Sequence, residues 1–173
     1  MSPHLLINAA LFQLTWFAAV LFGVVAGLAC VLLLAIHGAR GGIKTADLVL
    51  GSLAAAVGFG LDTVWIHTGI LDFNGAVIAP PWIVVLWLAT GLTINHSLQP
   101  MARRPLPGAV AAGLVAPVSY LSGEALGAIS IPRPELLAVV SITWFFLFAF
   151  VFSTVAPFIN RLFVHRQHGE SAR

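Results

Sequence analysis

Two carboxylates inside long apolar segments are the strongest candidates for chemistry in this sequence. Asp62 lies near the end of an apolar run that begins near Ala46, and Glu124 lies near the end of another run over about residues 108–129. An acidic side chain at the middle of a membrane helix costs about 2.5–3.5 kcal/mol on insertion scales, so it normally faces a protein interior, a partner or a watered cavity. Both residues therefore predict a buried polar site.

The expected depth of the two carboxylates points to acid–base chemistry. Asp62 and Glu124 each come a couple of turns before their helix leaves the membrane, which places both in the outer half of the bilayer. Two neighbouring carboxylates in a low dielectric do not both ionise readily, and the protonated one can donate a proton. The alternative is structural: the pair would bond Trp65, Tyr120 or backbone groups freed by Pro117, and would give packing specificity only.

Helical spacing predicts the neighbours of each carboxylate, because steps of three and four residues return to the same face. The stripe through Asp62 contains Trp65, Gly69 and Asp72, and the stripe through Glu124 contains Gly113, Pro117, Tyr120 and Gly127. We expect Glu124 to face the bundle beside Tyr120. The predicted roles are acid and base for the two carboxylates, and substrate positioning for Trp65 and Tyr120.

A third polar group, Asn95-His96-Ser97, is expected near the cytoplasmic end of its span. The His96 imidazole could bind a metal or a pigment, act as a base, or cap the helix. We expect Asn95 and His96 to form a second contact with a substrate. No second histidine stands at metal-ligand spacing and no HExxH or histidine-box pattern occurs, so we expect no metal site and no diiron desaturase or hydroxylase. No sequence motif indicates a particular cofactor. Asn8 and Asn160 could share this depth and bond between helices.

The composition indicates an all-α membrane protein. Of 173 residues, 60% are hydrophobic and 8% are charged, whereas soluble domains carry about a quarter charged residues. Basic residues lie between or after the apolar runs, which is typical of membrane topology and excludes a nucleic-acid surface. The first apolar stretch lacks a basic leader and a clear cleavage site, so we expect a retained span. Cys30 is expected to be a small buried hydrophobe.

The loops predict about six spans in one helical domain, residues 1–164, with both termini in the cytoplasm and a short polar tail at 165–173. The run from Leu5 to Ile36 would be roughly 48 Å long as one helix, and the hydrocarbon core is about 30 Å thick. We therefore expect two short spans that turn within residues 22–27, at Gly23 and Gly27. The alternative is one long helix and five spans. The other spans are expected at about 45–71, 82–98, 108–129 and 136–160.

Small residues four positions apart let helix backbones approach closely in lipid. Three such pairs predict a closed bundle: Ala54 and Gly58, Ala56 and Gly60, and Gly123 and Gly127. Deeper aromatic residues, Trp16 and Trp65, are candidates for the lining of an apolar ligand pocket.

Four short motifs resemble the bacterial family called domain of unknown function 2878. They are Phe12-Gln13-x-x-Trp16-Phe17, Leu61-Asp62-x-x-Trp65 with Gly69-x-Leu71-x-Phe73, Asn95-His96-Ser97, and Pro117-x-Ser119-Tyr120 with Gly123. The resemblance implies a multi-pass protein of the bacterial inner (cytoplasmic) membrane with no established activity. Genes of that family often stand beside genes for cyclopropane-type fatty-acid synthases and other lipid-modifying or singlet-oxygen-response proteins, which implies membrane-lipid chemistry.

Three functions remain open at this point. The first is a lipid- or isoprenoid-modifying enzyme, or a subunit of one. The second is a proton-coupled carrier or flippase, in which the carboxylates titrate during transport. The third is an accessory or structural subunit of a larger membrane complex. The expected partners are membrane lipids and either another membrane protein or a second copy of the chain, with no nucleic acid.

Overall fold

The computed structural model describes residues 2–40 and 45–170, and within these ranges it contains helices and no strand. Lys44 and the Gly41-Gly42 pair of the predicted basic loop, and Arg173 of the tail, lie outside the described residues. The all-α prediction is confirmed. The elements in chain order are α1 (Pro3–Arg40), α2 (Thr45–His67), α3 (Pro81–Thr93), α4 (Gln99–Ala102), α5 (Pro105–Ala125), the 3-10 turn η1 (Pro134–Leu136), α6 (Leu137–Phe150), the π-helical turn η2 (Val151–Val155) and α7 (Ala156–Glu170).

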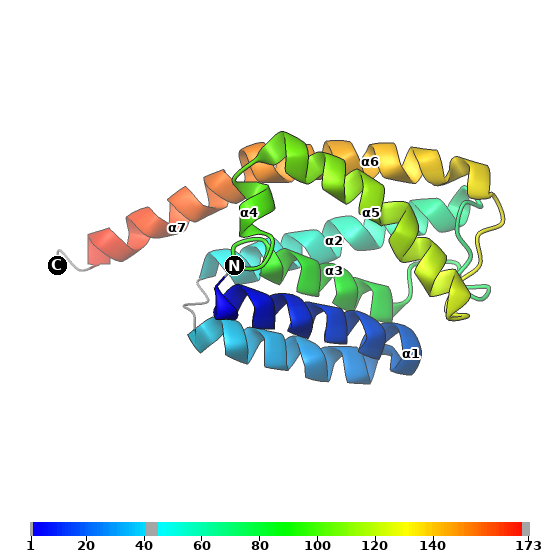
Figure 1. Cartoon of the computed structure of the whole chain (residues 1–173), viewed down its shortest axis with the longest axis horizontal. Helices are drawn as coiled ribbons and strands as arrows, with labels where there is room; N and C mark the ends of the chain where they lie inside the picture. The colour runs from blue at the N-terminus through cyan, green and yellow to red at the C-terminus, as the bar shows by residue number, and fades with distance from the viewer. Residues whose placement is uncertain (1, 41–44, 171–173) are drawn as a thin grey trace.

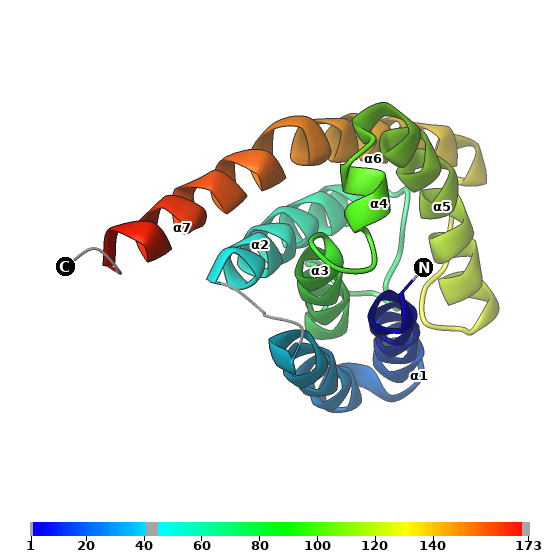
Figure 2. The same cartoon turned by 60° about the vertical axis from the view of Figure 1, so that its left-hand side comes forward.

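The first helix is a hairpin of two arms that turn at Gly23. This glycine has φ 79° and ψ −164°, a backbone conformation that reverses the chain. The arms run side by side in both views (Figures 1 and 2), and the rings of His4 and His37 stack with centroids 4.4 Å apart. A Cβ atom on Gly27 would lie 2.9 Å from the Ala19 Cβ, so the arms pack closely. The predicted hairpin is confirmed, and the single long helix is wrong.

The helices pack in two groups. Helix α3 lies between α1 and α2 and packs against both, whereas α5 packs along α6 (Figure 1). Helix α1 makes few contacts with α5. We call the end that holds Gly23, the α2–α3 loop and the α5–α6 loop the outer end, and the end that holds Ser2 and α7 the inner end. Helix α2 also contacts α7, and backbone hydrogen bonds join the loops of the outer end.

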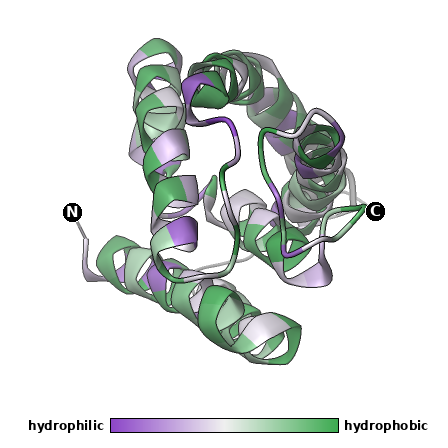
Figure 3. Ribbon diagram, turned by 90° about the vertical axis from the view of Figure 1, so that its right-hand side faces the viewer, coloured by the Kyte–Doolittle hydropathy of each residue, from purple (hydrophilic) through white to green (hydrophobic). Residues whose placement is uncertain are grey.

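The surface of this bundle is suited to lipid. Four helical segments are long and apolar enough to cross a membrane: Pro3–Ala39, Thr45–His67, Pro105–Ala125 and Pro134–Phe163. Large hydrophobic side chains such as Phe22, Val25 and Leu114 are exposed. Viewed from the outer end, the helices are mostly hydrophobic, and hydrophilic residues gather in the connecting loops (Figure 3). The chain is therefore a membrane protein; the number of crossings stays a prediction, because α3 has only 13 residues.

Glycines set the close contact between α2 and α3. A Cβ atom on Gly91 would lie 2.5 Å from the Leu50 carbonyl oxygen and 2.6 Å from the Gly51 Cα. A Cβ atom on Gly58 would fall within the Trp87 ring. The predicted packing role of Ala54 and Gly58 is confirmed here, since a Cβ atom on Gly91 would also lie 2.8 Å from the Ala54 Cβ.

The other two small-residue pairs do not pack helices together, so that prediction is wrong for them. Ala56 and Gly60 are exposed on the lipid side of α2, and a Cβ on Gly60 would meet nothing within 4 Å. Gly127 has φ +74° and lies in the turn after α5, where its freedom to adopt a left-handed conformation is what matters.

Helix α2 ends at His67, earlier than the predicted span over 45–71. Gly69 has φ 67°, a left-handed conformation that commonly ends a helix. Asp72 is therefore not on the helical stripe of Asp62, and that prediction is wrong. Instead, the backbones of Asp72 and Ser130 exchange hydrogen bonds of 2.9 and 2.8 Å, and the Asp72 carboxylate accepts one of 2.7 Å from the Gly75 N–H. These bonds join the two outer loops.

The remaining boundaries also differ from the predicted ones. Helix α3 ends at Thr93, and residues 94–98 form turns instead of the end of a span. Helix α5 ends at Ala125. The last span continues without interruption through the π turn η2 into α7, which reaches Glu170, so the predicted polar tail is helical up to that residue.

We predict that Gly91→Ala lowers the free energy of unfolding by about 1–3 kcal/mol, because the added Cβ would meet backbone atoms of α2 that cannot rotate away. Thermal unfolding in detergent measures the effect. Gly60→Ala is the matched control and should cause no loss, since the space at Gly60 is open. Equal stability of the two variants would contradict the close α2–α3 contact.

Candidate functional site

Asp62 is the centre of the buried polar site and has no solvent exposure. The indole Nε1–H of Trp87 donates to its Oδ2 at 2.7 Å, and the Tyr120 hydroxyl donates to its Oδ1 at 2.6 Å. Asp62 lies on α2, Trp87 on α3 and Tyr120 on α5. One carboxylate therefore joins three helices, with a donor on each of its oxygens.

Local sequence explains why these side chains meet. On α2, the buried positions Asp47, Gly51, Gly58, Asp62 and Trp65 recur at helical spacing and form the face toward the interior. Gly58 is one turn before Asp62, and its missing side chain leaves the space that the Trp87 ring occupies. A larger residue at position 58 would exclude the indole from the carboxylate.

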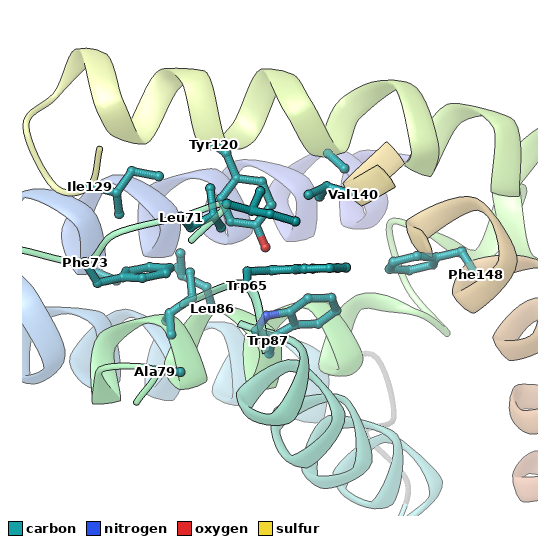
Figure 4. Close-up of a cluster of buried hydrophobic side chains, with 14 of the residues drawn as sticks. Trp65, Leu71, Phe73, Ala79, Leu86, Trp87, Tyr120, Ile129, Val140 and Phe148 are labelled. Carbon is teal, nitrogen blue, oxygen red and sulfur yellow. The ribbon is translucent and has the colours of Figure 1, made fainter. Parts of the chain in front are cut away.

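Further aromatic residues surround the three bonded groups. The Trp144 ring lies 5.0 Å from the Trp87 ring and 6.2 Å from the Tyr120 ring, measured between centroids. Its buried Nε1–H lies close to the Tyr120 hydroxyl but does not reach hydrogen-bond geometry. Figure 4 shows Tyr120, Trp65 and Trp87 gathered in the same buried cluster. This apolar surrounding keeps water away from Asp62 and strengthens its two hydrogen bonds.

Trp65 lies in this cluster, but it is not the partner of Asp62. Its side chain is buried, and its Nε1–H has no hydrogen-bond partner among the described residues. The indole that bonds Asp62 is Trp87, which comes from the neighbouring helix. Trp87 is therefore a site residue that the sequence reasoning missed.

An apolar cleft of about 580 Å³ lies on the other side of Trp87 and Tyr120. Its walls come from the first arm of α1, from α3, α5, α6 and η2, and they include Phe12, Gln13, Trp16, Phe17, Leu86, Thr90, Val115, Ser119, Trp144 and Phe152. This volume is typical of small-molecule sites. The cleft forms where α1 and α5 fail to pack together, and the side chains that bond Asp62 line it. Asp62 itself lies behind them.

Two of the motifs that carry the family resemblance converge on this cleft. Phe12, Gln13, Trp16 and Phe17 line it from α1, and Ser119, Tyr120 and Gly123 line it from α5. The expectation that Trp16 lines an apolar pocket agrees with its position; Trp65 is not part of this lining.

The structure does not place Glu124 in the interior beside Asp62. Glu124 is exposed, and its Oε1 accepts a hydrogen bond of 2.8 Å from the Ile131 N–H. The cause is the early end of α5 at Ala125, which puts Glu124 in the last turn, where its carboxylate reaches the returning loop. The predicted contact of Glu124 with the bundle interior is therefore wrong, and the two carboxylates are not brought together.

Asn95 and His96 belong to a separate polar cluster at the inner end. The Asn95 amide donates to the Asp47 Oδ1 at 2.7 Å and exchanges two hydrogen bonds with Asn160, at 2.9 and 2.8 Å. Asn8 accepts a bond of 3.1 Å from the Ser97 N–H. The predicted shared depth of Asn8, Asn160 and Asn95 agrees with these contacts. Asp47 lies roughly 22 Å along α2 from Asp62, at 1.5 Å per residue.

Three histidines extend this cluster toward the surface. His96 Nε2 lies 3.5 Å from the Asp47 Oδ2, without hydrogen-bond geometry, and His96 Nδ1 lies 3.5 Å from the His4 Nε2. His37 stacks on His4 and bonds its carbonyl oxygen at 3.2 Å. In the described part of the chain, no group of three or more His, Cys, Asp or Glu residues is arranged to hold a metal ion.

The sequence reasoning also missed Asp47, His4 and His37. Asp47 comes three residues after Lys44, close to a basic loop, but it is only 2% exposed. Its spacing to Gly51, Gly58 and Asp62 was the available signal, because all four fall on one helical face. The two histidines become neighbours only through the turn at Gly23, so no local spacing could have paired them.

A bundle of apolar helices around a buried carboxylate, with a cleft beside it, defines a helical membrane protein with a candidate apolar-ligand site. The chain belongs to the family described as Protein of unknown function (DUF2878), whose model matches residues 5–150. No curated protein and no solved structure matches the chain.

We predict that Tyr120→Phe lowers the free energy of unfolding by about 1–3 kcal/mol, because it leaves one oxygen of a buried carboxylate without its donor. Unfolding in detergent measures the loss. Ser153→Ala removes an exposed hydroxyl that donates to the Ala149 carbonyl and contacts the neighbouring Thr154 hydroxyl at 3.3 Å. It serves as the control, with a change below about 0.5 kcal/mol. A Tyr120→Phe protein as stable as the control would disprove the structural importance of this bond.

Proposed function

We propose that this protein binds a membrane lipid or isoprenoid in the α1–α5 cleft and acts on it, as an enzyme or as a subunit of one. The observation that carries the proposal is the juxtaposition of the apolar cleft of about 580 Å³ with the Tyr120–Asp62 pair in its wall. An apolar cavity beside a protein–lipid boundary favours a ligand that enters from the bilayer. A few polar groups in an otherwise apolar wall are typical of a site that fixes the orientation of a small molecule.

The roles of the residues follow from which of them a ligand can touch. Asp62 has no exposure, so it acts through its partners, whereas Tyr120 and Trp87 line the cleft. The Tyr120 hydroxyl is the candidate acid or base toward the ligand, because Asp62 accepts its hydrogen bond and can hold its proton. Asp62 is thus a positioning residue. Glu124 has no part in the cleft wall, and we assign it no role there.

We infer the orientation of the protein in the membrane from the positions of its basic residues. Arg103, Arg104 and Arg161 lie at the inner end, whereas Arg133 lies in an outer loop. Cytoplasmic loops carry an excess of basic residues, so we infer that the inner end faces the cytoplasm of a bacterial inner membrane. The cleft then opens within the bilayer, and the histidine cluster lies on the cytoplasmic side.

A proton-coupled carrier is the second candidate function. It is supported by the inner cluster, in which Asp47, His96, His4 and His37 form a row of titratable groups from a buried carboxylate toward the surface. Intramembrane rows of this kind occur in proton relays. Flux that depends on a proton gradient, and that is lost in His96→Ala, would favour the carrier over the enzyme.

We expect Val115→Trp to abolish binding of the lipid that travels with the purified protein, because an indole at position 115 fills the cleft. Mass spectrometry of the detergent-purified proteins identifies the bound molecule. Leu114→Trp is the matched control. It adds the same side chain on the exposed face of α5 that does not line the cleft, and binding should be retained. Identical lipids in all three proteins would contradict the proposed site.

We also expect Asp62→Asn, produced at the normal level, to alter the composition of the membrane lipids, because the amide can no longer take the Tyr120 proton. Lipid analysis of cells with the wild type and the variant measures this. Unchanged lipids would contradict the enzyme proposal. Co-purification of a stoichiometric partner protein that the variant does not affect would favour the accessory subunit instead.

A further inference from the structure

We infer that the ligand of the cleft carries an uncharged oxygen-containing group in the middle of its apolar chain, and that Gln13 and Ser119 bind this group. The inference rests on the proposed ligand-binding function and names the substrate class more narrowly. Gln13 lines the cleft from the first arm of α1, and Ser119 lines it from α5. The two polar side chains thus border one apolar space from two helices that scarcely touch each other.

Gln13 is a polar side chain without a partner. It is exposed, and none of the described residues hydrogen-bonds its amide. It lies near the middle of the arm over residues 3–22, so the predicted span over this arm would place it in the hydrocarbon core. An amide without hydrogen bonds is unfavourable in an apolar medium. A ligand that supplies a partner would recover much of this cost.

Ser119 differs from several other hydroxyls in the described helices. Thr15, Thr90, Ser122 and Thr143 each donate to the carbonyl oxygen four residues earlier, at 2.7–2.8 Å. Such bonds satisfy a hydroxyl within its own helix. Ser119 makes no such bond and has no other hydrogen-bond partner among the described residues. Its hydroxyl is therefore available to the cleft.

The chemistry of the lining defines the group that fits. The cleft wall, as far as the structure describes it, contains no Asp, Glu, Lys, Arg or His, so it provides no counter-charge for a phosphate, a carboxylate or an ammonium group. An amide and a hydroxyl each both donate and accept hydrogen bonds. They match a hydroxyl or a carbonyl group. Because Gln13 lies near the middle of an arm that we predict to span the membrane, we infer that this group lies along the apolar chain of the ligand instead of at its headgroup.

Competition between two probes tests this inference. The probes are a long-chain methyl ester with a mid-chain hydroxyl and the same ester without it, added together to the detergent-purified full-length protein. Native mass spectrometry gives the ratio of the two complexes. We expect the wild type to prefer the hydroxylated ester about tenfold or more. Gln13→Leu and Ser119→Ala should each reduce this preference severalfold.

The control is Thr143→Val, which removes a helical hydroxyl that already bonds Val139 and does not line the cleft. Its preference should equal that of the wild type. Equal binding of both esters to the wild type would overturn the oxygen recognition and leave the proposed apolar-ligand function standing. If neither ester bound the wild type, or if Val115→Trp did not prevent binding, the ligand site itself would be disproved.

Discussion

The buried carboxylate of Asp62 is the constraint on which the rest of the structure depends. A carboxylate in hydrocarbon is costly unless both oxygens are bonded, and here the donors come from two other helices, through Trp87 and Tyr120. Because the bonds are 2.7 and 2.6 Å long, α2, α3 and α5 must meet at one point. Gly58 leaves the space for the indole, so a residue with no side chain is as necessary as the charged one.

The cleft follows from how the other helices attach to this point. The α1 hairpin packs on α3, and α6 packs on α5. The first arm of α1 and α5 thus approach the Asp62 site from two sides without contacting each other along their length. The space between them is lined by Trp87 and Tyr120, which bond Asp62. It is also lined by two polar side chains without hydrogen-bond partners among the described residues, Gln13 and Ser119. This contact between a polar site and an apolar cavity supports the proposed lipid-binding function.

The sequence predicted the features that depend on length and on the cost of charge. The all-α bundle, the hairpin at Gly23 and the burial of Asp62 all follow from apolar runs that a 30 Å membrane core limits to about 20 residues each. Contacts between helices were less predictable. Trp87, and not Trp65, is the indole that donates a hydrogen bond to Asp62 because α3 packs closely on α2 at Gly91. The position of Glu124 depends on where α5 ends.

The polar cluster at the inner end was also difficult to predict, because it too depends on contacts between helices. Asp47 stands close to a basic loop, and only its helical spacing to Asp62 marks it as buried. The histidines at positions 4, 37 and 96 come from three distant parts of the chain, and a tertiary fold was needed to bring them together.

An electron cryomicroscopy map of the protein in lipid nanodiscs tests the central claim most directly. Since the chain is small, a rigid antibody fragment bound to an exposed loop would supply the necessary mass. We predict elongated density in the cleft that passes Gln13 and Ser119 and reaches Tyr120. A cleft closed by direct contact of α1 with α5, or filled by a helix of a partner protein, would contradict the claim that this space is a lipid-binding site.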